Sequence, residues 1–427
     1  MNGRRILATG LALALTSTAL LAQFKSDAYY VSVPFTTAPG IYEVDADTGV
    51  ATPFAVPALI PHYGWFGNDG NFYVPDRGVP GLLKILPDGS IVIHASGGHF
   101  IRPVTCIPTM DDDAWLVADM ESDKIVHVDY AGNQTLMYDS ASTGGLLDGP
   151  DGLAYDEDGN LFVANLGNDT IVKIDPQGNA TLFSDSDLIK APGGIAIDGG
   201  GNLFVANYDL HTIARFRLDT GEGMVFAGPD SSKMAAPNDL KLSRGGGLIV
   251  AGRVGRVSHI DALGNITVLS ENPDLSELDG VSVPNDDTLC SGRYESYGTG
   301  VAGTGGYVPS LRTVFSPCAG HNIALEFHDT VGGTQAMLLV SGAPLAPGQG
   351  NFLGAPLLID PSAPPFLAIP LWMPGAGAGN GDLDLQFVVP EDPGLPGLEL
   401  YHQFFAADPG APFGISASNG LKETFGL

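Results

Sequence analysis

The stretch "GNLFVANLGNDTIVKIDPQGN", Gly159 to Asn179, occurs a second time in closely similar form. The second copy, "GNLFVANYDLHTIARFRLDTG", runs from Gly201 to Gly221 and starts 42 residues later. Each copy sets runs rich in Val, Ile, Phe and Thr between Gly, Asp and Asn turns, which is typical of short antiparallel strands. With "GLAYD" before it and "ATLFS" after it, one copy predicts a four-stranded unit, the size of a β-propeller blade.

The repeat can be followed along the chain through the central residue of the second strand. Its steps are 43, 43, 46, 42 and 45 residues, and Cys290 follows 40 residues after the last valine as a weaker candidate. This regularity predicts blades rather than helices. The six valines are Val31, Val74, Val117, Val163, Val205 and Val250.

The first repeat begins with "AYYVSV", which matches the second strand of the other repeats, so the first strand of the first blade must come from elsewhere in the chain. The segment "DGVSVP", Asp279 to Pro284, is the natural donor. We therefore predict an all-β protein with a six-bladed propeller over residues 27–294, closed by pairing of 279–284 beside 29–33. Seven blades remain the alternative.

The two ends of the chain have a different composition from the repeats. Arg4 and Arg5 precede an apolar run that ends at Ala22, which predicts a signal peptide over residues 1–22; an N-terminal anchor is the alternative. Residues 297–427 hold 15 of the 32 prolines and several strand-like runs, which predicts a separate small β-sandwich. The Gly-rich stretch between Gly298 and Gly306 would be the joint.

The charge balance limits the possible partners. The net charge is −29, with 48 acidic and 19 basic residues, so a nucleic acid backbone would be repelled. We expect a secreted, periplasmic or cell-surface protein with no membrane span after signal cleavage. A small polar ligand, a glycan or a protein is the expected partner.

Two segments resemble known families. "GLAYDEDGNLFVANLGNDTIVKIDPQGN" resembles the NHL repeat, and the SMP-30/gluconolactonase-like propellers are similar. The ending "GLELYHQFFAADPGAPFGISASNGLKETFG" resembles a C-terminal module of secreted proteins in planctomycete-type bacteria. The first resemblance implies a propeller fold, which hosts lyases, lactonases and binding modules alike.

Two sets of loops meet on one face of a propeller, around its central channel. One set joins the fourth strand of a blade to the first strand of the next, and the other joins the second strand to the third. Because polar side chains gather in both sets, we predict a ligand site at this channel mouth. Its residues are His62, Arg102, Asp151, Asn165, Asn207, Asn238, Arg253 and Asp279.

The oxygen atoms of this ring suit a hard cation, so Ca²⁺ is a possible cofactor, held by Asp151, Asn238 and Asp279. The segments "PDGL" and "PNDL" resemble metal loops of SMP-30-like lactonases, which implies Asp151 and Asn238 as ligands. That family also uses an N-terminal Glu, and Glu43 lies in a third strand that points elsewhere. The alternative is that these Asp and Asn side chains cap turns.

Two functions remain open from the sequence. The first is a secreted binding or scaffold module that uses the channel-mouth face. The second is a metal-dependent hydrolase or lyase, lactonase-like, at the same face. No complete set of a general base and metal ligands can be found, so no catalytic residue is assigned and the binding module is favoured.

Overall fold

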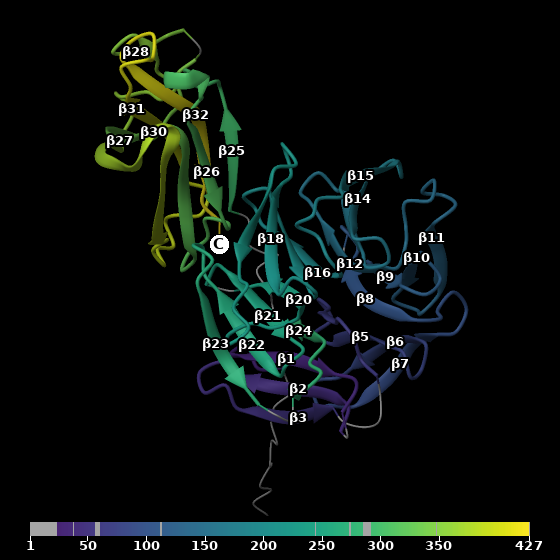
Figure 1. Ribbon diagram of the computed structural model, residues 1–427. Helices are drawn as coiled ribbons and strands as arrows, with labels where there is room; N and C mark the ends of the chain where they lie inside the picture. The colour runs from purple at the N-terminus through teal and green to yellow at the C-terminus, as the bar shows by residue number, and fades with distance from the viewer. Residues whose placement is uncertain are drawn as a thin grey trace, which may run out of the picture.

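The computed structural model describes residues 24–426 apart from positions 37, 56–59, 112, 244, 273–274, 285–291 and 347. The predicted signal peptide and Cys290 therefore lie outside the described residues. The regular secondary structure of the described residues is almost all β-strand, with a short 3₁₀ turn at Thr304–Gly306 (Figure 1). Among these residues no helix is long and apolar enough to cross a bilayer.

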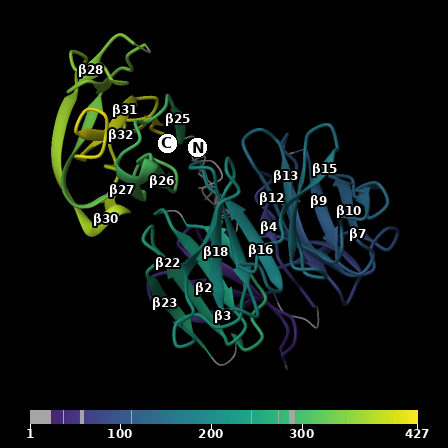
Figure 2. The same ribbon diagram turned by 45° about the horizontal axis from the view of Figure 1, so that its top comes forward.

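Residues 28–282 form six four-stranded antiparallel sheets, the blades of a propeller (Figures 1 and 2). Blade 1 consists of β24 (Gly280–Ser282), β1 (Ala28–Val33), β2 (Gly40–Asp45) and β3 (Ala51–Ala55). Blade 2 consists of β4 (Trp65–Phe66), β5 (Phe72–Asp76), β6 (Gly81–Ile85) and β7 (Ile91–Ser96). Blade 3 consists of β8 (Pro103–Pro108), β9 (Ala114–Asp119), β10 (Lys124–Asp129) and β11 (Gln134–Asp139).

The remaining three blades follow the same order along the chain. Blade 4 consists of β12 (Pro150–Tyr155), β13 (Leu161–Asn165), β14 (Thr170–Ile174) and β15 (Ala180–Ser184). Blade 5 consists of β16 (Pro192–Ile197), β17 (Asn202–Asn207), β18 (Thr212–Arg217) and β19 (Gly223–Ala227). Blade 6 consists of β20 (Pro237–Leu242), β21 (Leu248–Gly252), β22 (Arg256–Ile260) and β23 (Ile266–Glu271).

The ring closes as the sequence predicts. β24 pairs antiparallel with β1, with Tyr30 opposite Ser282 and Val31 opposite Val281. The Gly280 amide also donates to the Ser32 hydroxyl at 2.8 Å. The late segment therefore supplies the innermost strand of the first blade, and both valines lie in one fully buried cluster with Leu278.

Replacing Gly280 by valine is expected to weaken this closure. A Cβ there would lie 2.7 Å from Ser32 Oγ and 2.9 Å from the His62 carbonyl oxygen, so the strands must separate. We expect a loss of about 1–3 kcal/mol in the free energy of unfolding, measured by urea denaturation. Gly245→Val is the matched control, because no atom lies within 4 Å of its Cβ. Equal losses in the two variants would contradict the closure.

The repeated Asp…Gly-Asn text builds the turns that connect neighbouring strands. Asp175 Oδ1 accepts from the amides of Gln177 (2.9 Å) and Asn179 (2.8 Å), and Asn179 Nδ2 donates to Asp175 Oδ2 (2.8 Å). Gly178 supplies the left-handed residue of the turn, with φ of 85°. Equivalent Asp–Asn pairs recur at residues 129–133, 156–160, 198–202 and 261–265. The Asp and Asn side chains of these segments therefore serve as turn caps.

The C-terminal module consists of one six-stranded sheet and a small ribbon. The sheet order is β25 (Arg293–Tyr297), β32 (Ile415–Thr424), β31 (Glu399–Ala407), β27 (Asn322–Ser341) and β26 (Ser310–Val314), with β30 (Phe366–Val388) along β27. The ribbon is β28 (Asn351–Phe352) with β29 (Ala355–Pro356). The sheet curls, so that Phe327 and Phe404 meet with ring centroids 5.0 Å apart. By pairing, the module begins at Arg293, not at residue 297.

The module has two buried clusters of its own and shares a third with the propeller, and this shared cluster argues against the predicted separate folding. One buried cluster joins Phe204 and Leu240 of blades 5 and 6 with Phe315, Ile323 and Phe425 of the module. The rings of Phe204 and Phe315 stack with centroids 5.4 Å apart. Figure 1 shows the module lying beside the blades that contain β18 and β20.

Polar contacts reinforce this junction. The Phe315 amide donates to Asp198 Oδ2 at 2.8 Å, and the Gly199 amide donates to Ser316 Oγ at 2.9 Å. On the propeller side, Asp198 and Gly199 belong to the turn between β16 and β17. The glycine-rich stretch was a poor guide to the boundary, because sequence composition does not reveal which faces share a core.

Candidate functional site at the channel mouth

Strand register shows which residues are equivalent between blades. A proline of the first strand pairs with the last residue of the second strand: Pro61 with Asp76, Pro103 with Asp119, Pro150 with Asn165, Pro192 with Asn207 and Pro237 with Gly252. Positions in the channel can therefore be counted from these pairs. Comparing equivalent positions in this way distinguishes side chains that form the turns from side chains that face the channel mouth.

Asn165 and Asn207 build turns and do not reach the channel. Asn165 Nδ2 donates to the Leu146 carbonyl oxygen at 2.7 Å, and its Oδ1 accepts from the Asp148 amide at 3.2 Å. Asn207 Oδ1 accepts from the Lys190 amide at 3.0 Å. Both side chains are fully buried. We therefore remove these two from the candidate site, since their polar atoms hold backbone.

Four other predicted residues do converge. The Asp279 carboxylate contacts His62 Nδ1 through Oδ2. Its Oδ1 accepts from Asn238 Nδ2 at 2.6 Å and from the Arg253 guanidinium at 3.0 Å. The side chain of Asp279 is only 1% exposed. Burial alone would raise the pKa of this carboxyl, but His62 and Arg253 outweigh burial, so the pKa lies below its usual value.

Asp151 lies on the opposite side of the channel and is nearly buried. Tyr63 from blade 2 reaches it with its hydroxyl 3.5 Å from Asp151 Oδ2. Tyr63 also fills the space beside Gly193, where an added Cβ would lie 3.2 Å from its hydroxyl. Burial, and then the charges of Asp279 and Asp239, raise the pKa of Asp151 well above its usual value. The two carboxyl groups at the channel mouth thus have pKa values shifted in opposite directions.

Arg102 is not at the position that the sequence comparison gave it. Pro103 is the paired proline of blade 3, so Val104, not Arg102, matches Asp151 and Asn238. Arg102 precedes Pro103, the first residue of β8, and its charge is one of the influences that lower the pKa of Asp151 against burial. Its Nε is buried and has no hydrogen-bond partner among the described residues.

Sequence reasoning missed a rim of half-buried residues around the network. Arg253 lies one position after Gly252, and the matching positions of blades 2 and 5 hold Arg77 and Tyr208. The Arg253 guanidinium carbon lies 5.6 Å from the Phe35 ring centre and 5.5 Å from that of Tyr208. Counting one residue beyond each turn cap would have found Arg77 and Tyr208. The loop residue Phe35 breaks the repeat and gives no such signal.

The residues proposed as calcium ligands do not fit a calcium ion in this arrangement. Ca²⁺ needs six to eight oxygen ligands. Asp279 is already engaged by a guanidinium and an imidazole, and the amide nitrogen of Asn238 faces Asp279. Asp151 contributes one buried oxygen, Oδ1, without a partner. A cation at Asp279 would also be repelled by Arg253, so we derive no step through a metal here.

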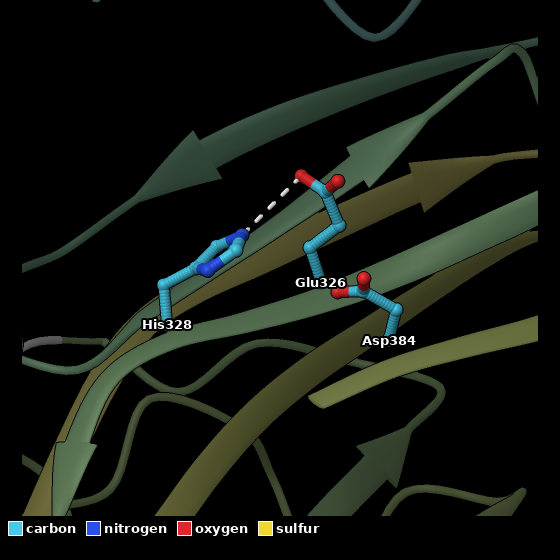
Figure 3. Close-up of side chains that lie close together, drawn as sticks. All are labelled: Glu326, His328 and Asp384. Atoms are coloured by element: carbon cyan, nitrogen blue, oxygen red, sulfur yellow. Dashed lines mark ion pairs between the residues drawn. The ribbon is translucent and has the colours of Figure 1, made fainter. Parts of the chain in front are cut away.

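One group with metal-ligand chemistry lies elsewhere, in the C-terminal module (Figure 3). Within the described residues, Glu326, His328 and Asp384 place ligand atoms within 4.8 Å of one another. Arg215 of blade 5 already holds Glu326 through two hydrogen bonds of 2.7 and 3.0 Å. Burial opposes ionisation, but His328 and Arg215 lower the pKa of Glu326 to about 2. This cluster is an ion-paired part of the junction, and the guanidinium disfavours a metal ion.

A cavity of about 670 Å³ lies at the other end of the channel, where the first strands finish. Trp65, Tyr155 and Lys241 line it. Three of its charged residues have partners inside the protein: Lys241 Nζ lies 2.9 Å from Asp239 Oδ1, and Asp156 and Asp198 accept from Asn160 and Asn202. The unpaired buried polar atoms of the channel are instead at the mouth. We therefore place the candidate site at the mouth.

Comparison with known proteins supports the fold and the resemblance. Residues 62–182 match the family described as SMP-30/Gluconolactonase/LRE-like region. No curated protein matches the chain. A chain from the crystal structure of a nidogen/laminin complex is similar in structure, with a TM-score of 0.51 and 15% identity. The match covers 60% of this chain and 98% of that chain.

Two enzymes show weaker similarity. A gluconolactonase from Xanthomonas campestris has 16% identity and a TM-score of 0.46, with 60% of this chain and 87% of that chain covered. A virginiamycin B lyase from Staphylococcus aureus has 14% identity and a TM-score of 0.44, with 62% and 95% covered. The chain thus resembles the NHL and SMP-30/gluconolactonase-like propellers, as its repeats indicate. The likeness of the C-terminal module to planctomycete-type modules stays a prediction.

Proposed function

We propose that this protein is an exported binding module that holds a small polar ligand at the channel mouth. The observation that carries the proposal is a set of buried polar atoms without partners among the described residues. These are His62 Nε2, Arg102 Nε, Asp151 Oδ1 and Arg253 Nε. Buried polar atoms in proteins are nearly always hydrogen-bonded, so a bound ligand or ordered water must complete this set.

The arrangement of these groups favours a specific ligand over solvent alone. Donors and acceptors come from four different blades, and Asp279 fixes His62, Asn238 and Arg253 relative to one another. Side chains that are locked in this way lose little freedom on binding. The half-buried rim then gives a ligand access to the network. Export follows from the predicted signal peptide and remains part of the proposal.

The proposal predicts that binding depends on the two polar groups that flank the channel axis. Asp151→Asn and His62→Gln should each weaken binding of a neutral sugar, polyol or lactone about tenfold or more, since each removes a buried partner. Isothermal titration calorimetry of the panel against wild type and variants measures this. Asp219→Asn is the control, because its side chain is 59% exposed in a turn on the other face. Ca²⁺ is titrated in parallel to test the metal prediction.

Binding that survives both channel variants unchanged would move the ligand site away from the mouth. A panel that shows no heat with the wild-type protein would leave the polar network as a structural feature. Thermal unfolding of each variant, followed by circular dichroism, confirms that any loss of binding is not a loss of fold.

A second candidate function, metal-independent acid–base catalysis, is favoured by one observation. The His62 imidazole contacts a carboxylate through Nδ1 while Nε2 is unpaired, and the pKa of Asp151, nearby in the channel, is raised. Such a pair could remove a proton at His62 Nε2 and donate one from Asp151, as a lactone hydrolase or a lyase requires. Turnover in the same lactone panel, lost in His62→Gln, would establish this function over simple binding.

A further inference from the structure

We propose that the channel mouth recognises the carboxylate group of a small organic acid, and that Arg77 and Arg102 hold it. This inference deepens the proposed function and rests on the mouth being a ligand site.

The first step is that Arg77 and Arg102 differ from every other arginine whose side chain the structure describes. Eight arginines fall in this part of the chain, and six of them form an ion pair with a carboxylate. Arg77 and Arg102 form none among the described residues. In a chain with 48 acidic and 19 basic residues, two neighbouring arginines without a counterion are unexpected. An anionic ligand would supply the missing charge.

The second step is that these two guanidinium groups lie in one place. Arg77 follows the last residue of β5 and Arg102 precedes the first residue of β8 in the neighbouring blade, where Tyr63 bridges Thr105, so both lie at the mouth end of adjacent blades. Burial and then Arg102 lower the pKa of Arg77, while Asp279 and Glu121 oppose this shift. The guanidinium carbons of Arg77 and Arg253 lie 5.6 Å from the same Phe35 ring centre. Phe35 therefore lies beside both groups and holds them at the mouth.

The third step is that Arg253 has a carboxylate partner, whereas Arg77 and Arg102 have none among the described residues. Arg253 is bound to Asp279, so its charge is largely neutralised. Arg77 and Arg102 keep their donors available, and both are half-buried, so they are reachable yet poorly solvated. A guanidinium fork matches a carboxylate in geometry, and an anion would relieve the repulsion between the two groups.

The fourth step concerns the rest of the ligand. The Phe35 ring centre is 6.2 Å from that of His62, so the arginine rim and the unpaired His62 Nε2 are close neighbours. An acid with a hydroxyl or carbonyl near its carboxylate could bond the rim and His62 together. A small hydroxy acid is therefore the substrate class that fits best.

The test compares acids with their uncharged amides. Lactate and mandelate, each against its amide, are titrated by calorimetry into the full-length protein at low and at high salt. We expect the acids to bind at least about tenfold more tightly than the amides, and more weakly at high salt. Arg77→Met and Arg102→Met should each remove about tenfold or more of the affinity for the acids. Arg312→Met is the control, since Arg312 lies in the C-terminal module and pairs with Glu222.

Each outcome decides the proposal. Acids and amides that bind equally, or acid binding that neither arginine variant weakens, would overturn it. If neutral ligands bind and depend on Asp151 while the acids show no advantage, the carboxylate inference fails and the proposed function stands. If no compound of either panel binds, both fail together. Loss of acid binding in the Arg312 variant would also contradict the proposed site, because Arg312 lies outside the channel mouth.

Discussion

A protein truncated after residue 284 is expected to lose its cooperative unfolding transition, although it keeps all six blades. Phe315, Ile323 and Phe425 fill one buried cluster with the apolar residues of blades 5 and 6. Truncation exposes that surface and leaves the Arg215 guanidinium, which is 4% exposed, without Glu326. Each large apolar side chain that loses its cover costs about 1.5–3 kcal/mol, and several together are comparable with the whole stability of many domains.

Differential scanning calorimetry of the full chain and of the truncated protein measures this effect. Phe315→Ala in the full chain is the finer test, because it removes one ring from the junction and keeps the chain length. We expect it to lower the free energy of unfolding by about 3–5 kcal/mol. A truncated propeller with a single sharp transition near that of the full chain would show that the two parts fold independently.

Asp279→Asn is expected to have the second large effect. The amide keeps the size of the side chain, but it leaves Arg253 with only the 3.8 Å contact to the exposed Glu277 and puts an uncharged group against His62. We expect a loss of about 3 kcal/mol or more in the free energy of unfolding. Ligand binding should weaken too, since Asp279 orients His62, Asn238 and Arg253. Glu277→Gln is the control: this carboxylate lies 3.8 Å from Arg253 and is 49% exposed, so we expect a change under about 1 kcal/mol.

The effect of Asp279→Asn should depend on pH in one direction. The pKa of Asp279 is lower in the folded protein than its usual value of 3.8. The carboxylate therefore contributes its full stabilisation above about pH 4, and this contribution is lost as the pH falls through the folded pKa. The stability gap between wild type and variant should be widest near neutral pH and should shrink on acidification below pH 4. A gap that stays constant down to pH 2 would contradict the ion-paired network.

The blade architecture could be predicted from the sequence because each strand and turn depends on a short segment, and these segments recur along the chain. The spacing from Val31 to Val250 fixes the strands, and the missing first strand at the N-terminus identifies residues 279–284 as its donor. β24 beside β1 confirms that inference. Each Asp…Gly-Asn turn likewise depends on residues within five positions of one another.

The site residues were harder to predict from the sequence, because the repeat uses the same residue types, Asp and Asn, for turn caps and for groups that face the channel. Asn165 and Asp151 cannot be told apart by sequence pattern. Asn165 hydrogen-bonds to the backbone, whereas Asp151 faces the channel. Arg102 was placed by loop similarity, whereas strand pairing puts Val104 at that position. The shared core at Phe315 and the pairing of Arg215 with Glu326 join residues about 111 positions apart, and no local pattern reports them.

The measurement that tests the central claim most directly is a crystal structure of the protein with the tightest-binding compound of the panels. The claim is that the ligand occupies the channel mouth and completes the buried polar set there. We expect density within hydrogen-bonding distance of His62 Nε2 and Asp151 Oδ1, with a carboxylate between Arg77 and Arg102 when the ligand is an acid. Density in the cavity lined by Trp65 and Tyr155 at the opposite end, with an empty mouth, would contradict the account.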